Sequence, residues 1–428
     1  MVSPQDKIVI IGAGCFGIST AYHLSKRGFT DITVIDRSET LPAKDGSSND
    51  FNRIVRTSYS DNVYTVLAKE AIEIWKDRTV WEDDSYHECG VLVLASRVSD
   101  SFVDESYIND KNQGSRVDNL PDAEAIKKVF PPHVPVSSFN DNRGYMNHDG
   151  GWADAGKAVS YLTSKVKSMG VKVNGGHTVK CLRRRNNITT GVECEDGTVF
   201  EASKVVIATG SWTSSVFRDI GLKEKCLATG QVIAMIQLTK EEADRYRQTP
   251  VVLNFATGFY CFPPTDSHIV KLAIHAPGFT HTVDNVSTPR TIITNPEDGL
   301  AIPKKSVLAL REHLRTVYPE LAGKPFKSTR LCWYNDSPDG DWIIGPHPED
   351  GSLIFATAGS GHAFKFFPVI GRLVADAIQD KLDPPLAKKF AVNRPASFAA
   401  KTDGVRAAEV VKELDISQLC TPEDLLLV

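Results

Sequence analysis

The feature that constrains this chain most is a glycine motif between two short apolar runs near its N-terminus. The first run, at residues 8–11, stops at Gly12-x-Gly14-x-x-Gly17; a helical pattern follows, and the second run ends at Asp36. In such a unit Gly12 permits a tight turn, Gly14 lets the backbone approach a pyrophosphate, and Gly17 lets the helix pack closely on the strand. The positive helix end would face the phosphates, and Asp36 would accept hydrogen bonds from ribose hydroxyls. The unit predicts a dinucleotide site; the alternative is a tight strand–helix turn without a ligand.

Composition excludes several classes of protein. The chain has 428 residues, enough for two domains, and its 49 Lys and Arg against 53 Asp and Glu argue against a nucleic-acid-binding protein. No apolar run approaches the ~18 residues of a membrane span. We find no signal peptide and no C-terminal peroxisomal tripeptide, so we expect a cytoplasmic protein that binds no membrane. The eight cysteines form no CxxC pair, so we expect neither a metal site nor a disulfide framework.

Two later segments indicate that the chain returns to the nucleotide-binding sheet. The apolar run at 205–208 ends in a turn of small residues. A second run at 353–358 leads through a glycine turn into a helix that reaches about residue 379. A nicotinamide enzyme usually has one compact nucleotide unit. A chain that approaches its cofactor three times is more typical of a flavoprotein.

Near its C-terminal third the chain resembles a known family. Cys332 is followed at 338–339 by Pro-Asp, and this segment resembles the flavin-attachment segment of monomeric sarcosine oxidase and fructosyl amino acid oxidase (amadoriase). The resemblance spans nearly the whole chain, including Asp-Gly-Gly-Trp at 149–152 and Ser-Gly-His-x-Phe-Lys-Phe at 360–366. It implies FAD attached covalently through Cys332, which from the residue alone would be a buried apolar side chain. The cofactor-binding residues that we expect are Gly12, Gly14, Cys15, Phe16, Gly17, Asp36, Arg37, Ser48, Arg53, Gly210, Trp212, Cys332, Gly359, Gly361, Phe364 and Lys365.

We therefore expect an α/β fold in which a discontinuous Rossmann-type FAD-binding domain is joined to a mostly antiparallel β-sheet domain for the substrate. The architecture implied is that of glucose oxidase and D-amino-acid oxidase. The expected boundaries are 1–90, 150–225 and 330–390 for the FAD-binding domain, 91–149 and 226–329 for the substrate domain, and 391–428 for a C-terminal tail. Locally, residues 63–75 have helical spacing after a possible Asp61 cap. Residues 97–150 are polar and irregular, with one short helix expected near 122–130.

Three basic side chains are candidates for contacts with a substrate carboxylate and the flavin. Arg53 and Arg56 match the paired arginines of the family, and the resemblance implies that Arg56 grips the carboxylate while Arg53 lies near the flavin. A guanidinium fork fits a carboxylate bidentately, although two arginines on a strand can also simply be exposed. Lys365 matches a lysine that contacts the same carboxylate. Its charge at a helix start opposes the macrodipole unless an anion is present.

Lys271 is the candidate for promoting the reaction with oxygen. The resemblance places it over the flavin face, where a fixed positive charge stabilises superoxide as it forms. On a strand Lys271 shares its face with Ile269 and Ala273, which slightly favours a buried lysine over the commoner solvated one. Tyr260 and His275 lie at the family's spacing on either side, and we expect them to shape the substrate pocket.

The pocket and the scaffold resemble different members of the family. His275, Tyr260 and Tyr334 agree with sarcosine oxidase, whereas amadoriases generally carry an acid, a Phe and a small residue there. In contrast, the Pro-Gly-Phe turn at 277–279 and Asn-Asp at 49–50 resemble amadoriases. His275, Tyr260 and Tyr334 would favour the neutral amine of a substrate.

We therefore expect a monomeric, FAD-dependent oxidase of secondary or N-methylated amino acids, which converts the C–N bond to an imine and reduces oxygen to hydrogen peroxide. The alternatives are a fructosyl amino acid oxidase, a pipecolate- or saccharopine-type oxidase, a dehydrogenase with another acceptor, and a flavin-binding protein without catalytic activity. Aromatic residues that could line the pocket, or equally pack in the core, are Phe51, Tyr59, Tyr64, Trp333 and Phe364.

Overall fold

A six-stranded sheet carries the glycine motif. The computed structural model describes residues 2–98, 100–395 and 410–426. The strand order is β22-β23-β13-β1-β2-β9, and every pair is parallel except β22 with β23. The strands are β1 (Ile8–Ile11), β2 (Ile32–Ile35), β9 (Lys172–Asn174), β13 (Lys204–Ile207), β22 (Ile343–His347) and β23 (Asp350–Thr357). The apolar runs at 205–208 and 353–358 thus join the sheet of the glycine motif, as expected.

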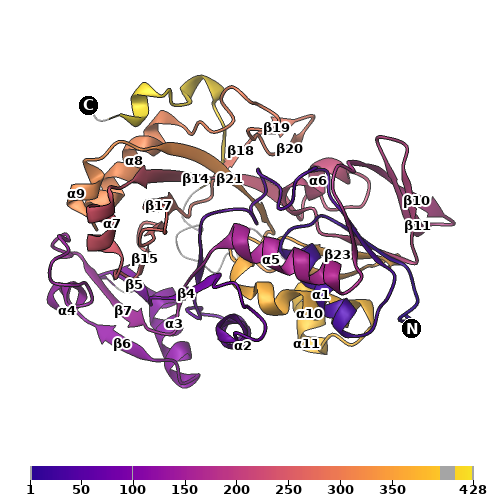
Figure 1. Cartoon of the computed structure of the whole chain (residues 1–428), viewed down its shortest axis with the longest axis horizontal. Helices are drawn as coiled ribbons and strands as arrows, with labels where there is room; N and C mark the ends of the chain where they lie inside the picture. Colours follow the sequence, from indigo (N-terminus) through magenta and orange to yellow (C-terminus); the bar gives the residue numbers. More distant parts are fainter. Residues whose placement is uncertain (1, 99, 396–409, 427–428) are drawn as a thin grey trace.

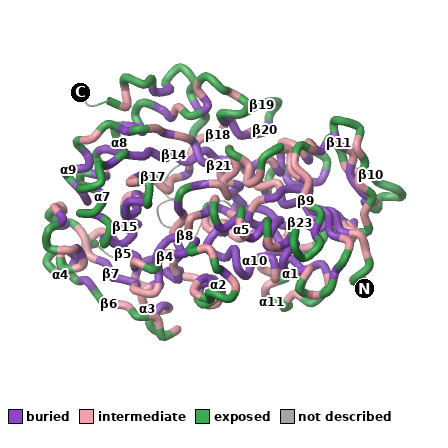
Figure 2. The backbone as a smooth tube through the Cα atoms, in the orientation of Figure 1, coloured by how far each residue is buried: buried purple, intermediate pink, exposed green. Residues whose placement is uncertain are grey.

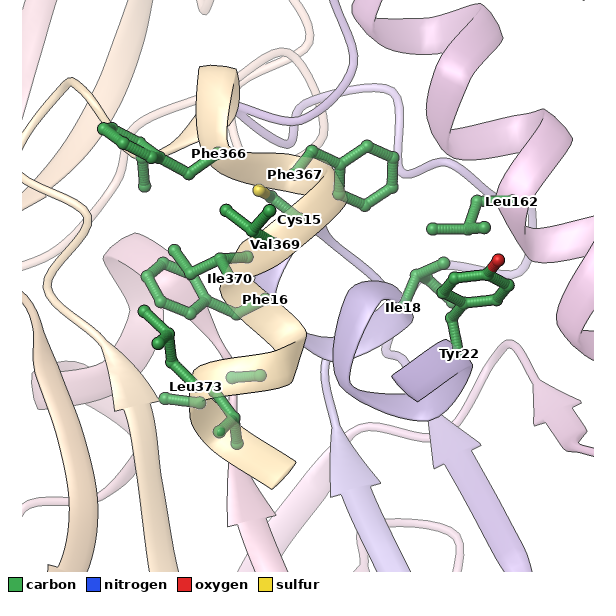
Figure 3. Close-up of a cluster of buried hydrophobic side chains, with 14 of the residues drawn as sticks. Cys15, Phe16, Ile18, Tyr22, Leu162, Phe366, Phe367, Val369, Ile370 and Leu373 are labelled. Atoms are coloured by element: carbon green, nitrogen blue, oxygen red, sulfur yellow. The ribbon is translucent and has the colours of Figure 1, made fainter. Parts of the chain in front are cut away.

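Helices on this sheet bury apolar faces against one another. Phe16 and Ile18 of the first helix lie near Phe367 and Ile370 of a helix some 350 positions further along, and Leu162 flanks them (Figure 3). A Pro at the start of α10 suits the first turn of a helix. The helices of this part are α1 (Cys15–Lys26), α2 (Asn62–Lys76), α5 (Ala155–Ser168), α6 (Thr213–Val216), α10 (Phe367–Ile378) and α11 (Pro384–Phe390).

A second, larger sheet forms the other side of the molecule (Figure 1). Its order is β24-β18-β14-β17-β16-β15-β5-β7-β6, and β21 also pairs with β14. Most pairs are antiparallel; β15 with β5 and β18 with β24 are parallel. The strands are β5 (Val91–Ser96), β6 (Val117–Leu120), β7 (Asn142–Asn147), β14 (Leu227–Gln237), β15 (Val251–Asn254), β16 (Phe259–Cys261), β17 (Ile269–Ile274), β18 (Phe279–Thr280), β21 (Ser328–Asp336) and β24 (Lys412–Glu413). The mixed α/β fold class is confirmed.

Short elements complete the chain. The helices beside the large sheet are α3 (Ser101–Asn112), α4 (Ala123–Lys127), α7 (Lys240–Tyr246), α8 (Lys304–Arg315) and α9 (Pro319–Ala322). Three small sheets contain β3 (Arg53–Val55), β8 (Gly151–Ala153) and β4 (Tyr86–Glu88); β10 (Val179–Arg185), β11 (Ile188–Cys194) and β12 (Val199–Glu201); and β19 (Thr282–Val283) with β20 (Val286–Ser287). No helix among the described residues is long and apolar enough to cross a membrane.

Local expectations fare differently in different segments. The Asp61 cap is confirmed, because its carboxylate accepts a hydrogen bond from Val63 N at 2.9 Å at the start of α2. The short helix expected near 122–130 is confirmed as α4. The expectation that the rest of 97–150 is irregular is wrong, since α3, β6 and β7 also form there. Both sheets carry a buried core, purple in Figure 2. The domain boundaries stay a prediction, and the expected tail at 391–428 lies partly outside the described residues.

Candidate active site

A cavity lies at the carboxyl ends of β1, β2, β13 and β23, where doubly wound sheets bind nucleotides. Its empty volume is about 1340 Å³. Most of the residues expected to bind the cofactor line it: Gly12, Gly14, Cys15, Phe16, Asp36, Arg37, Ser48, Arg53, Gly210, Trp212, Gly359, Gly361 and Phe364. Gly17, Cys332 and Lys365 are not among its lining residues.

Two glycines of the motif are required by close backbone contacts. Gly12 has a φ of +108°, and a Cβ there would lie 2.4 Å from the carbonyl oxygen of Ala208. A Cβ on Gly17 would lie 1.9 Å from the carbonyl oxygen of Gly12. Gly12 thus permits the turn against β13, and Gly17 permits the close strand–helix contact.

The residues of this cavity fit a flavin dinucleotide. Gly14 gives the start of α1 no side-chain cap of its own, and Cys15 N donates to Ser48 Oγ at 2.9 Å. Gly14, Cys15 and Phe16 line the cavity, so the positive end of the helix lies at its wall. Asp36 accepts from Ala13 N at 2.8 Å, which holds its carboxylate at the end of β2. The guanidinium of Arg37 lies 4.2 Å from the Trp212 ring centroid and offers a cationic, flat wall. This donor set suits phosphates, a ribose and an aromatic ring system.

Substitution of Gly12 tests whether the turn is needed for the cofactor. We expect Gly12→Ala to purify with little or no FAD and to unfold at a lower temperature. Gly28, also at positive φ but with open space around its Cβ position, is the matched control. Gly28→Ala adds only backbone strain, about 1–3 kcal/mol, whereas Gly12→Ala adds overlap with the backbone as well. Equal FAD content in the two variants would contradict this reading of the motif.

A second cavity adjoins the first and shares Arg53, Tyr334, Gly361 and Phe364 with it. The candidate substrate residues Arg53, Arg56, Tyr260, His275, Tyr334 and Lys365 all line this second cavity. Phe102, Leu253, Phe255 and Phe262 give it an apolar wall that belongs to a buried cluster. Tyr59, Tyr64 and Phe364 line it and also belong to the buried core, Trp333 lines the cofactor cavity, and Phe51 is an exposed residue that lines neither.

Two basic side chains meet at the wall of the second cavity. The Arg56 guanidinium lies 4.6 Å from the Tyr59 ring centroid, and its Nη1 is buried without a hydrogen-bond partner among the described residues. Lys365 Nζ donates to Tyr59 Oη at 2.7 Å and to the carbonyl oxygen of His362 at 2.8 Å. Burial and the nearby Arg56 charge hold the pKa of Lys365 well below its usual range. No carboxylate pairs with Lys365 in the described residues, so this corner suits an incoming anion.

Lys271 belongs to a buried charge cluster centred on Asp50. Its Nζ, fully buried, donates to Asp50 Oδ2 at 2.8 Å and to the carbonyl oxygen of Asn52 at 2.6 Å. Arg53 pairs with the same Asp50 oxygen, and Arg330 Nη2 lies 3.0 Å from it. Burial lowers the pKa of Lys271 to about 7, against the opposing effect of the Asp50 charge. Three cations from three strands therefore share one carboxylate.

The same cluster reaches Cys332 and two tyrosines. Arg53 Nη2 donates to Cys332 Sγ at 3.2 Å, and Cys332 is buried on β21. Burial raises the pKa of Tyr260 to about 12, and the Tyr260 and Tyr334 side chains are hydrogen-bonded. His275 lies 5.9 Å from Tyr334, measured between ring centroids. The structure thus brings Arg53, Cys332, Tyr260, Tyr334 and His275 together.

Sequence reasoning missed Asp50 as a site residue, together with Asn52 and Asp110. Asp110 is fully buried on α3 and accepts hydrogen bonds from Tyr145 Oη at 3.0 Å and Asn147 Nδ2 at 2.9 Å. Burial raises the pKa of Asp110, and the charge of Arg56 opposes that rise. The side-chain Nδ2 and Oδ1 of Asn52 are buried without partners among the described residues. Asp50 and Asn52 precede Arg53 in a polar segment, and only the Asn-Asp resemblance pointed to it.

Comparisons with known proteins agree with this geometry. The sequence model of a family described as FAD dependent oxidoreductase matches residues 7–377. L-saccharopine oxidase from Schizosaccharomyces pombe is 31% identical over 395 residues, which cover 87% of this chain and 89% of that protein. Monomeric sarcosine oxidase from Arthrobacter sp. is 26% identical over 400 residues, covering 91% and 96%. The crystal structure of fructosyl amine: oxygen oxidoreductase (Amadoriase I) from Aspergillus fumigatus superposes with a TM-score of 0.85 at 25% identity, covering 98% of each chain.

Proposed function

The chain belongs to the family of FAD-dependent oxidoreductases, and on this premise we propose that it oxidises secondary, N-substituted amino acids with oxygen as acceptor. The observation that carries the proposal is the pair of basic side chains, Arg56 and Lys365, at the wall of a cavity that adjoins the cofactor cavity. The pair suits the carboxylate of an amino acid. The names of the relatives, saccharopine oxidase and sarcosine oxidase, support an amino-acid-derived amine as substrate.

In this proposal the chain binds and orients the substrate. Arg56 and Lys365 hold the carboxylate, which turns the amine and its neighbouring C–H towards the shared wall of the two cavities. The partly buried Tyr260 and Tyr334 side chains and His275 surround the amine and favour its neutral form. Phe255 and its apolar neighbours accept the remainder of the substrate.

The overall reaction balances without a further reactant. The amine loses two electrons and two protons to become an imine, and oxygen gains two electrons and two protons to become hydrogen peroxide. When bound, FAD supplies the two-electron redox chemistry of this exchange. Water then hydrolyses the imine, or a nucleophile within the substrate captures it.

Covalent attachment through Cys332 is part of the proposal. Cys332→Ala should release its FAD into the supernatant on acid precipitation, whereas the unchanged protein should keep it with the pellet. The buried Cys261, on β16 of the same sheet, is the matched control, and Cys261→Ala should keep its flavin. Flavin that stays with precipitated Cys332→Ala would remove Cys332 from this role.

The substrate class is tested by anaerobic bleaching of the flavin. N-methyl amino acids, pipecolate, saccharopine and fructosyl amino acids are added one at a time, and air is then admitted. Bleaching by N-methyl amino acids or pipecolate, followed by rapid recovery of colour with peroxide formed, supports the proposal. Bleaching by fructosyl compounds alone would replace it with an amadoriase activity. Bleaching without recovery in air would indicate a dehydrogenase.

A longer substrate with a distal amino group is the second candidate. The second cavity is also lined by Asp61, Asp339 and Asp341, a group of carboxylates. Lys389 pairs with Asp61 and Asp341 at 2.8 Å each, and the three acids outnumber their two basic partners. Bleaching by saccharopine at far lower concentration than by N-methyl amino acids would favour this candidate.

A further inference from the structure

The three cations around Asp50 come from separate parts of the chain. Arg53 starts β3, Lys271 lies on β17 and Arg330 lies on β21. All three contact the same oxygen, Oδ2 of Asp50, whose side chain is only 2% exposed. Burying one anion among three cations costs free energy, which the ion pairs and hydrogen bonds of the site must offset.

The charges on this cluster are strongly coupled. Burial by itself raises the pKa of a carboxyl, but Arg330, Arg53 and Lys271 outweigh burial and hold the pKa of Asp50 well below its usual range. Asp50 therefore stays ionised. In return its charge opposes the effects of burial, Arg53 and Arg330, which all lower the pKa of Lys271. The other ionisable groups that face the cluster through Arg53 are Cys332, Tyr260 and Tyr334.

We propose that Asp50 is a positioning residue for oxygen reduction, because its carboxylate fixes the Lys271 ammonium in place and keeps it charged. This inference rests on the proposed oxidase function. Asp50 lines neither cavity, so it acts through Lys271 and not by touching the substrate. Lys271 Nζ lies 5.0 Å from the ring centroid of Phe262, which does line the substrate cavity. In this proposal the Lys271 ammonium, held by Asp50 behind Phe262, stabilises the negative charge that develops on oxygen.

The test measures flavin reoxidation by oxygen against pH in the holoenzyme, for the unchanged protein, Asp50→Asn and Arg330→Met. Loss of a neighbouring opposite charge should move the upper pH limit of fast reoxidation down by about 1–3 units in Asp50→Asn. Removal of the Arg330 charge should move the same limit up. If the substitutions only damaged packing, both variants would reoxidise their flavin more slowly, but their upper pH limits would not move in opposite directions. Asp50→Glu should restore the limit of the unchanged protein.

A double variant separates action through Lys271 from action by any other route. As a single substitution, Asp50→Asn should slow flavin reoxidation at pH 8 at least tenfold. Added to Lys271→Met, it should cause no further slowing. The inference is overturned if Asp50→Asn slows both backgrounds by the same factor, or if its pH limit does not move. If Asp50→Asn does not fold, Arg330→Met decides: an upward shift supports the inference, and an unchanged limit overturns it.

Thermal unfolding of the holoenzyme gives a readout that does not depend on activity. A buried lysine with a lowered pKa destabilises the fold at low pH, and stability rises as pH increases from its folded pKa towards the unfolded value. In Asp50→Asn this rise should start at lower pH than in the unchanged protein, and it should vanish in Asp50→Asn with Lys271→Met. If the proposed oxidase function fails, this measurement still tests the coupling. Identical pH dependence of unfolding in Asp50→Asn and the unchanged protein would then overturn it.

Discussion

Lys271→Met should reoxidise its flavin with oxygen about 10²–10³ times more slowly than the unchanged protein, the usual cost of losing one preorganised electrostatic group. Anaerobic reduction by the substrate should change far less, because Lys271 lines neither cavity. The two half-reactions are followed separately by stopped-flow absorbance of the flavin. A surface lysine of the cofactor sheet, Lys172, whose side chain is 65% exposed, serves as the control, and Lys172→Met should alter neither rate.

The rate of flavin reoxidation should also depend on pH. The pKa of Lys271 is lowered to about 7, so its ammonium is present below this pH and is lost as pH rises through it. Reoxidation in the unchanged protein should therefore fall above pH 7, whereas Lys271→Met should show no such fall. A Lys271→Met variant that slows both half-reactions equally, or that keeps the fall, would remove Lys271 from oxygen reduction.

The nucleotide-binding part of this fold could be predicted because its signals are local. Strand, glycines, helix and acid follow one another within about 30 residues. The close backbone contacts of this unit require glycines, and these glycines are visible in the sequence. The burial of Lys271 could also be predicted, since Ile269 and Ala273 on the same strand face are apolar. In the structure both neighbours are buried and Lys271 is fully buried.

Asp50 could not be predicted in the same way, because nothing local marks it as buried. Its partners Arg53, Lys271 and Arg330 lie 3, 221 and 280 residues along the chain. Only the folded arrangement of β3, β17 and β21 offsets the cost of burying a carboxylate. β7 could not be predicted for a related reason. Its residues, Asn142–Asn147, show no alternation of apolar and polar side chains, and the strand is defined only by its pairing with β5 and β6.

Arg56→Met should lower kcat/KM for amino-acid substrates by a factor of about ten to 150, which corresponds to the 1.5–3 kcal/mol of a hydrogen bond to a charged group. Nη1 of Arg56 is buried and lacks a partner among the described residues, so a carboxylate bound there gains an interaction that the protein itself does not supply. Secondary amines without a carboxylate should lose far less. Steady-state kinetics on matched pairs of amines with and without the carboxylate measure the difference. Arg78, whose side chain is 62% exposed after α2, provides the control Arg78→Met.

Lys365→Met and the double variant show whether both cations hold one carboxylate. If they do, the two losses should not add, because a substrate released from one cation is held less firmly in the geometry that the other requires. Lys365 also donates to Tyr59 Oη, and the Arg56 guanidinium lies over the same ring. Tyr59→Phe therefore measures how much kcat/KM falls when Arg56 and Lys365 are both present but Lys365 loses its hydrogen bond to Tyr59. Equal losses on amines with and without a carboxylate would mean that Arg56 and Lys365 maintain the cavity wall and do not bind the substrate's acid group.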